Sequence, residues 1–156
     1  MTPLRICLIG SGTVGTWLLG VLDAQAERLA SRYGAEVTVV GLANARDGFV
    51  YDPGGLDVPP VLAALAEGRP ITGQRGARHW PSALEGLRAT EADLLVEVSA
   101  SPPADGEPGT AHIREALRAR RGLWASPPGI RPLSGPCIPT FILLPGNRPG
   151  TRFPTG

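Results

Sequence analysis

Three glycines near the start of the chain have a spacing that suits dinucleotide binding. Gly10, Gly12 and Gly15 form the pattern G-x-G-x-x-G directly after the apolar residues 6–9. In a turn from a strand into a helix, the first glycine permits the tight turn and the second lets the backbone approach a pyrophosphate, while the third lets helix and strand pack closely. The pyrophosphate then lies against unpaired amides of the helix N-terminus. Because the pattern is short, the alternative interpretation is a glycine-rich turn without a ligand.

The residues on either side of the glycines have the periodicities that a dinucleotide-binding unit requires. Residues 6–9 are continuously apolar, which is typical of a strand buried on both faces of a parallel sheet. Residues 13–29 then place apolar side chains at helical intervals, so a helix is predicted there. This order favours dinucleotide binding over a turn without a ligand. A phosphate-binding loop of the G-K-[ST] type is excluded because the chain contains no lysine.

A second group of candidate residues follows the strand predicted at residues 36–42. In folds of this kind the end of the second strand binds the adenosine ribose, usually through an acidic side chain on the 2′-hydroxyl. Here the loop expected at 43–48 offers Asn44 and Arg46. An amide with a guanidinium suits a 2′-phosphate better than a bare ribose, so these residues favour NADP over NAD. In the alternative interpretation Arg46 is merely an exposed loop charge.

A third group follows the strand predicted at residues 92–99. Ligands of open α/β sheets bind outside the carboxyl ends of the strands. The candidates at this end are Glu97, Ser99, Ala100 and Ser101. A helix is predicted over 110–121, with acidic residues and Pro108 near its start and arginines at its end, as the helix dipole favours.

The segment between these groups predicts only short elements. The pattern indicates a turn at 51–55, a helix at 56–67 that ends at Gly68, a loop with some extended structure at 69–81, and a helix at 81–89. His79 lies in that loop beside Trp80. We interpret this histidine as a packing or surface residue, because no neighbour in the sequence completes a triad or a metal site.

Length and composition favour one α/β domain with a Rossmann-like, doubly wound parallel sheet. The chain has 156 residues, of which 42% are hydrophobic, and a net charge of +1. This charge gives no electrostatic basis for binding nucleic acid, and no apolar run is long enough to cross a membrane. The N-terminal apolar run is too short for a signal peptide, and Cys7 and Cys137 make no disulfide framework. We therefore expect a cytoplasmic chain with a small-molecule cofactor as its partner.

The composition changes at Gly122. Residues 122–156 include fourteen proline or glycine residues and none of the fourteen acidic residues of the chain. Such a segment cannot propagate a helix and offers few amides to a sheet. We therefore predict an NAD(P)-binding domain over 1–121 with an incomplete sheet, followed by an irregular tail over 122–156 that is disordered or loosely docked.

Three segments of the chain resemble the N-terminal NAD(P)-binding domain of homoserine dehydrogenases. They are residues 9–15, residues 40–46, and residues 93–99 with their continuation through Gly106-Glu107-Pro108 and His112-Ile113-Arg114. The last combination, a V-E-x-[ST] strand end followed by G-E-P and H-I-R, is the most particular of the three. The resemblance covers about three quarters of the chain.

The resemblance implies reversible hydride transfer between NAD(P)H and aspartate 4-semialdehyde, which gives L-homoserine on the route to threonine and methionine. It also implies a set of cofactor-binding residues. These are Gly10, Gly12, Thr13, Val14 and Gly15 at the pyrophosphate, Asn44 and Arg46 at the adenosine end, and Ser99 with Ala100 at the nicotinamide. Glu97 is expected to stabilise the strand end rather than to contact substrate.

The chain departs from this family at the residues that carry catalysis. Family members continue into an A-N-K-G-P type segment, whose lysine lies near nicotinamide and substrate, and then into a substrate and dimerisation domain with a proton-donating lysine. Here residues 122–132 contain no lysine and none follows. An arginine, with a pKa above about 12, is a poor proton donor. We therefore expect a truncated chain with no catalytic residue and no metal site.

Three interpretations of this departure stay open. The chain is a catalytically incomplete enzyme, or a non-catalytic dinucleotide-binding module that a homo-oligomer or a second polypeptide completes, or a fragment that neither folds fully nor binds a cofactor. A frameshift near codon 122 of a GC-rich gene would explain the change in composition. That hypothesis predicts that another reading frame downstream encodes the missing lysine segment.

Overall fold

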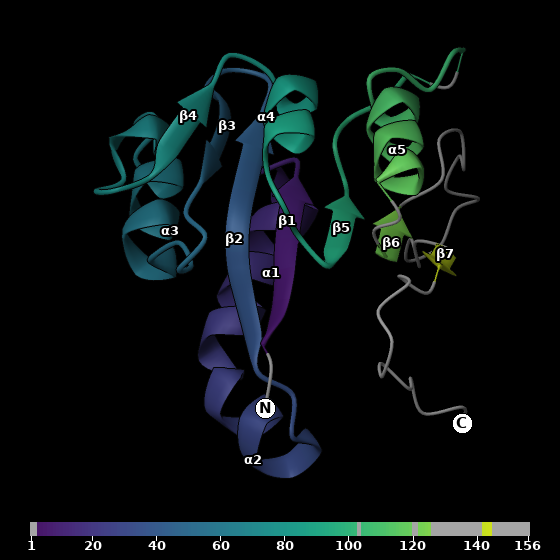
Figure 1. The fold of residues 1–156 in the computed structure, drawn as a ribbon. Coiled ribbons are helices and arrows are strands. Elements are labelled where there is room, and N and C mark those ends of the chain that lie inside the picture. Colours follow the sequence, from purple (N-terminus) through teal and green to yellow (C-terminus); the bar gives the residue numbers. More distant parts are fainter. Residues whose placement is uncertain (1–2, 103, 120–121, 126–141, 145–156) are drawn as a thin grey trace, which may run out of the picture.

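The computed structural model describes residues 3–102, 104–119, 122–125 and 142–144, which form an α/β fold around one mixed sheet (Figure 1). The strands lie in the order β4-β3-β2-β1-β5-β6-β7. Their bounds are β1 Leu4–Ile9, β2 Val37–Asn44, β3 Gly48–Tyr51, β4 Arg78–Trp80, β5 Leu94–Glu97, β6 Gly122–Ala125 and β7 Ile142–Leu144. The central strands β2, β1, β5 and β6 are parallel, and β3, β4 and β7 are antiparallel to their neighbours. The predicted Rossmann-like α/β class is confirmed.

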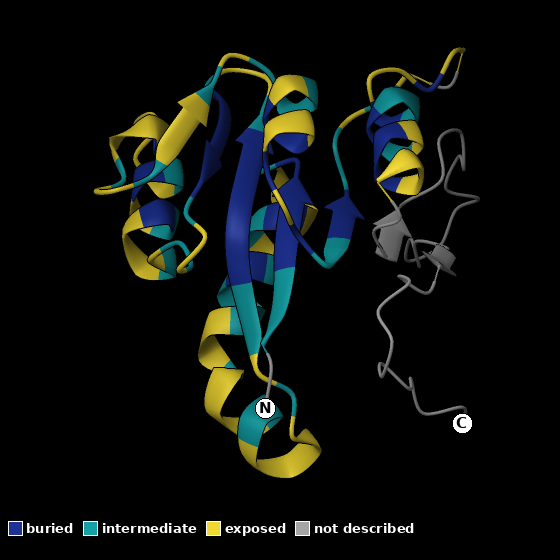
Figure 2. Cartoon of the chain, in the orientation of Figure 1, coloured by how far each residue is buried: buried dark blue, intermediate teal, exposed yellow. Residues whose placement is uncertain are grey.

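The helices lie on both faces of this sheet. Their bounds are α1 Thr13–Ala24, α2 Ala26–Tyr33, α3 Val58–Ala66, α4 Ala83–Ala89 and α5 Gly109–Arg118, with a short 3₁₀ turn, η1, at Ile71–Gly73. Figure 2 shows that most of β1, β2 and β5 is buried, whereas exposed residues lie mainly on the helices and the connecting segments. No helix in the described part of the chain is long and apolar enough to cross a membrane.

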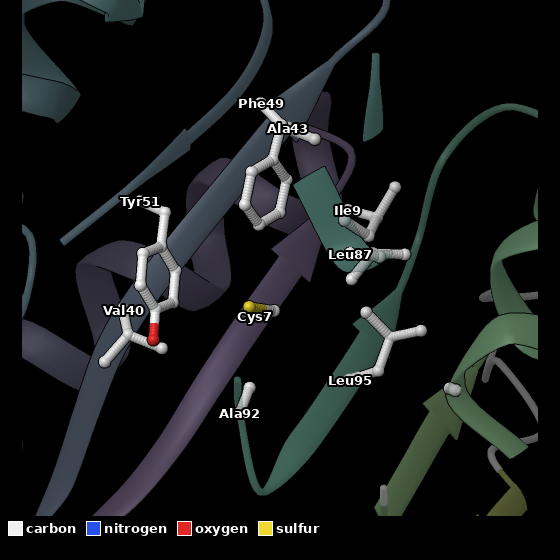
Figure 3. Close-up of a cluster of buried hydrophobic side chains, with 10 residues drawn as sticks. Cys7, Ile9, Val40, Ala43, Phe49, Tyr51, Leu87, Ala92 and Leu95 are labelled. Carbon is white, nitrogen blue, oxygen red and sulfur yellow. The ribbon is translucent and has the colours of Figure 1, made fainter. Parts of the chain in front are cut away.

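The two faces of the sheet bury separate hydrophobic clusters because side chains along a strand alternate between faces. On one face, Leu19 of α1 and Val61 of α3 pack with Leu8 of β1. On the other face, Leu87 of α4 packs with Ile9 of β1 in the cluster that Figure 3 shows. The helices on both faces thereby fix β1 in the centre of the sheet.

The helix predicted at residues 13–29 is two helices in the structure. The chain leaves helical geometry at Gln25, and α2 then continues to Tyr33. None of the α2 residues is buried, so no core contact requires α2 to follow the axis of α1. Gly34, in the left-handed conformation with φ of +61°, ends α2.

The loop predicted at residues 43–48 is instead the end of a strand and a hairpin turn. Strand β2 continues through Asn44, and β3 returns antiparallel to it with Asn44 opposite Gly48. Gly48 has a φ of +81°, and a Cβ on it would overlap the carbonyl oxygen of Trp80. All four residues of β3 are buried. They include Tyr51, the first residue of the turn predicted at 51–55.

The structure also differs from the expectation of few sheet contacts beyond residue 121. Strand β6 pairs parallel to β5, and β7 pairs antiparallel to β6. Neither strand contains a proline, so each retains the backbone amides that pairing needs. The remainder of the predicted tail and Cys137 lie outside the described residues, and the division of the chain at residue 121 stays a prediction.

Substitution of Gly86 in α4 tests how closely this helix packs against β3. A Cβ on Gly86 would overlap the ring of Phe49, so Gly86→Ala is expected to lower the free energy of unfolding by about 1–3 kcal/mol. Gly20 in α1 is the matched control, because no atom lies within 4 Å of its Cβ position. Gly20→Ala is expected to stabilise the protein by about 0.5–1 kcal/mol. Urea unfolding followed by circular dichroism measures both; equal effects would contradict this packing.

Candidate functional site

The glycine turn joins β1 to α1 at the carboxyl edge of the sheet. Gly10 has a φ of +106°, which favours glycine, and its amide donates to the Ala43 carbonyl over 2.8 Å. A Cβ on Gly10 would lie 2.7 Å from both the Ser99 nitrogen and the Val98 carbonyl carbon. The first glycine is therefore required by its conformation and by direct contact with the segment after β5.

The other two glycines of the motif differ in their surroundings. A Cβ on Gly15 would overlap the Gly10 carbonyl oxygen, so this glycine lets α1 pack against its own turn. Gly12 has no atom of the described residues within 4 Å of its Cβ position and a φ of −74°, which any residue adopts. Protein packing therefore does not require a glycine at position 12. Its missing side chain leaves open space beside the start of α1.

The N-terminus of α1 carries the features of an anion site. Its N-cap residue is Gly12, no side chain caps its first amides, and its first turn contains no acidic residue. Thr13 and Val14 are exposed there. Unpaired amides and the positive end of the helix dipole both favour a bound anion. This arrangement fits a pyrophosphate, which approaches through the space that Gly12 leaves open.

Asn44 and Arg46 are bonded to Asp47 in the β2–β3 turn. Asn44 Oδ1 accepts from the backbone amide of Asp47 over 2.6 Å, and Asn44 Nδ2 donates to Asp47 Oδ2 over 3.1 Å. Arg46 donates to both carboxylate oxygens of Asp47, over 2.8 and 2.9 Å. These hydrogen bonds from Arg46 are the main cause that lowers the pKa of Asp47 to about 2.

Arg46 also holds the turn to the segment after α3. Its guanidinium donates to the carbonyls of Gly68 and Arg69, over 3.0 and 2.8 Å, and its side chain is half exposed. The Ile71 amide donates to Asp47 Oδ2 over 3.2 Å. Asp47 therefore compensates the positive charge of Arg46, the side chain predicted to bind a 2′-phosphate. The preference for NADP stays a prediction.

The carboxyl end of β5 contains the third group of candidate residues. Glu97 is buried, and its Oε1 accepts from the Ser99 amide over 2.8 Å. The Ser99 hydroxyl is buried and has no hydrogen-bond partner within the described part of the chain. Ala100 is exposed, whereas Ser101 Oγ accepts from the Gly109 amide over 3.1 Å. The Glu97 and Ser101 side chains thus hold the backbone amides of Ser99 and Gly109. The Ser99 hydroxyl and the exposed Ala100 are left as the candidates for contact with a ligand at this end.

The structure places the three groups at one edge of the sheet. Strand β1 pairs with β2 on one side and with β5 on the other, so the glycine turn lies between the two remaining groups. Direct contacts connect them, since Gly10 bonds to Ala43 and abuts Ser99. His79 is exposed, with Nε2 2.8 Å from the Asp47 carbonyl oxygen, and the described residues contain no cluster suited to a metal ion.

His112 is the residue near this site to which the sequence analysis assigned no role. It is buried in α5, with Nδ1 2.5 Å from Glu97 Oε2. Both residues belong to the segments that carry the family resemblance, V-E-x-S and H-I-R. Their presence in these two segments was the available sequence signal for a link between Glu97 and His112. Their separation of 15 residues in the sequence gave no indication that they are in contact.

Comparison with known proteins finds similarity to homoserine dehydrogenases, although no protein-family model matches the chain. The homoserine dehydrogenase of Methanocaldococcus jannaschii is 25% identical over 116 residues, which cover 74% of this chain and 34% of that protein. The structure of homoserine dehydrogenase from Thermoplasma acidophilum is 26% identical with a TM-score of 0.62, covering 82% of this chain and 36% of that one. A hyperthermophilic archaeal homoserine dehydrogenase in complex with NADPH shares the fold, with a TM-score of 0.64 at 19% identity over 83% of this chain and 37% of that chain.

These findings confirm the predicted resemblance to the N-terminal NAD(P)-binding domain of homoserine dehydrogenases. The chain spans about a third of the length of the relatives that it matches.

Asp47→Asn tests how much the hydrogen bonds of the Asp47 carboxylate in the β2–β3 turn contribute to stability. Because Arg46 lowers the pKa of Asp47 from 3.8 to about 2, the ionised carboxylate stabilises the fold above pH 4, and this contribution is lost as the pH falls toward 2. The variant is expected to lose about 1–3 kcal/mol at pH 7 and less at pH 2. Urea unfolding at both pH values measures this difference.

The matched control for this prediction is Asp57→Asn. Asp57 is exposed at the start of α3, and its side chain caps no amide. This control is expected to change stability by less than about 0.5 kcal/mol. An Asp47→Asn variant with the same loss at pH 7 and pH 2 would contradict the role given to the ionised carboxylate.

Proposed function

We propose that this chain binds NADP(H) or NAD(H) and supplies the cofactor-binding part of an oxidoreductase of the homoserine dehydrogenase type. The observation that carries the proposal is the start of α1, where uncapped amides adjoin the open space at Gly12. A packing role explains Gly10 and Gly15 but not Gly12. The NADPH bound to a homoserine dehydrogenase of the same fold supports this choice of ligand.

The order of the strands supports a specific placement of the cofactor. In the proposal the pyrophosphate lies at the central turn, the adenosine lies toward β2, and the nicotinamide lies toward β5. The residues assigned to these parts are Gly10, Gly12, Thr13, Val14 and Gly15, then Asn44 and Arg46, and then Ser99 and Ala100. The buried, unpartnered hydroxyl of Ser99 suits a polar group of the ligand.

The reaction proposed for the complete enzyme is the reversible reduction of aspartate 4-semialdehyde to L-homoserine, in the cytoplasm. Reduced nicotinamide, when bound, supplies the hydride that the aldehyde carbon accepts. The alkoxide formed needs a proton, and this chain contains no lysine to donate it. Its arginines hold their protons too tightly for this purpose. We therefore assign binding and orientation of the cofactor to this chain, and proton donation to a further domain or polypeptide.

The second candidate function is a non-catalytic dinucleotide-binding module, which the absence of lysine favours. Both candidates predict that the chain alone binds cofactor without turnover. The purified chain is expected to bind cofactor without oxidising L-homoserine in the presence of NADP⁺ or NAD⁺, as followed by absorbance at 340 nm. Turnover by the chain alone would show that it contains its own proton-transfer group.

Gly12→Ala tests the binding site itself. A methyl group at position 12 meets no protein atom, so the variant is expected to fold with unchanged stability. The same methyl group occupies the approach to the α1 amides and is expected to weaken binding by about tenfold or more. Titration with NADPH and with NADH, followed by nicotinamide fluorescence, measures the affinity. Gly20→Ala is the control in the middle of the same helix, and equal affinities of both variants would contradict the proposed site.

A further inference from the structure

One buried carboxyl group connects strand β5, the segment after it and helix α5. Glu97 is 2% exposed, and the two oxygens of its carboxyl group have different partners. Oε1 accepts from the Ser99 amide over 2.8 Å, and Oε2 lies 2.5 Å from Nδ1 of His112, which is 5% exposed. The position of Ser99 relative to α5 is therefore set through Glu97.

Burying this polar pair between α5 and β5 costs desolvation free energy that an apolar contact would not cost. Burying a carboxyl group and an imidazole removes both from water, and a well-packed apolar pair of similar volume is often at least as stable. A polar pair, however, fixes distances and directions that apolar contacts leave free. The structure therefore gives Glu97 and His112 a role in placing what is bonded to them.

The segment after β5 is held at further points on both sides. The Val98 amide donates to the Ile9 carbonyl over 2.8 Å, which ties the segment to β1. Ser101 Oγ accepts from the Gly109 amide, and a Cβ on Gly109 would lie only 2.6 Å from that oxygen. Residues 98–101 are thus fixed between the glycine turn and the start of α5.

The side chain of Ser99 contrasts with this well-bonded backbone. Its hydroxyl is buried and has no hydrogen-bond partner among the described residues, although its amide is bonded to Glu97. The Ser99 backbone also abuts Gly10, at the turn proposed to hold the pyrophosphate. A buried hydroxyl without a partner costs free energy unless a ligand supplies one.

We propose that Glu97 and His112 are positioning residues for the dinucleotide, because they hold the Ser99 hydroxyl beside the glycine turn for a hydrogen bond to the ligand. The carboxamide of nicotinamide has the required chemistry, since it offers both a donor and an acceptor. This inference rests on the proposed function. It adds His112, from a helix distant in sequence, to the groups on which cofactor affinity depends.

Affinity for NADPH, measured by fluorescence titration of the 156-residue chain, tests this inference together with urea unfolding of each variant. Ser99→Ala is expected to weaken binding by up to about tenfold, the value of one hydrogen bond. It is not expected to lower stability, because it removes a buried group that has no partner. His112→Leu is expected to weaken binding by a similar factor through loss of the Nδ1 contact.

Two further variants separate positioning from general destabilisation. His112→Asn retains an N–H group near the position of Nδ1, so its affinity is expected to return to within about threefold of the wild type. Glu115→Gln is the matched control on α5, because Glu115 is a buried acid bonded to Arg88 of α4 rather than to the segment after β5. It is expected to lower stability and leave the affinity unchanged.

The double variant His112→Leu with Ser99→Ala is expected to bind no more weakly than either single variant, since both act through one hydroxyl. The inference would be overturned if the loss of affinity in the double variant equalled the product of the two single losses. It would also be overturned if His112→Leu and Glu115→Gln weakened NADPH binding equally. If His112→Leu does not fold, unchanged affinity in Ser99→Ala overturns it alone. A wild-type chain that binds neither NADPH nor NADH would instead refute the proposed function, and this inference with it.

Discussion

The close approach of three backbones at Gly10 is the constraint on which the rest of this structure depends. Gly10 lies directly against Val98 and Ser99, and the start of α1 lies against the Gly10 carbonyl. Any side chain at position 10 or 15 would force β1, β5 and α1 apart. The two hydrophobic clusters on the faces of the sheet, both of which include β1, could then not form together.

The same constraint assembles the candidate site. Because β1 is central, its turn lies between the ends of β2 and β5, and the hydrogen bond from Gly10 to Ala43 fixes the end of β2 beside it. The protein satisfies the polar groups at the outer two ends in different ways. The Asp47 carboxylate accepts hydrogen bonds from the Asn44 and Arg46 side chains. The Glu97 carboxylate accepts one from the Ser99 amide and pairs with His112 Nδ1. The first amides of α1 have no side-chain cap and the Ser99 hydroxyl has no hydrogen-bond partner among the described residues, and in the proposed function both bind the ligand.

Local patterns in the sequence predicted the parts of this fold that local interactions determine. The apolar run of β1, the glycine turn and the helical period after it are each contained within a few residues. All three appear in the structure, although the helix predicted at 13–29 divides at Gln25. The helix predicted over 56–67 appears as α3, and Gly68, predicted to end it, follows in the left-handed conformation. In these elements the residue type alone limits the backbone strongly.

The features that sequence reasoning missed depend on distant partners. Strand β3 is specified by burial of Phe49 against α4 and by the space that Gly48 leaves for Trp80. Strand β6 pairs with β5 although its surroundings are rich in proline. The partner of Glu97 lies on another element, so no periodicity pointed to His112.

The most direct test of the account is a titration of the isotopically labelled chain with NADPH, followed residue by residue through backbone amide chemical shifts. The account predicts that the largest changes occur at residues 12–15, with further changes at 44–46 and 99–100. The α2 amides, which lie far from the ends of β1, β2 and β5 in Figure 1, should change little. Saturable changes confined to other parts of the chain, or no change at millimolar NADPH, would contradict the claim that the glycine turn binds a dinucleotide.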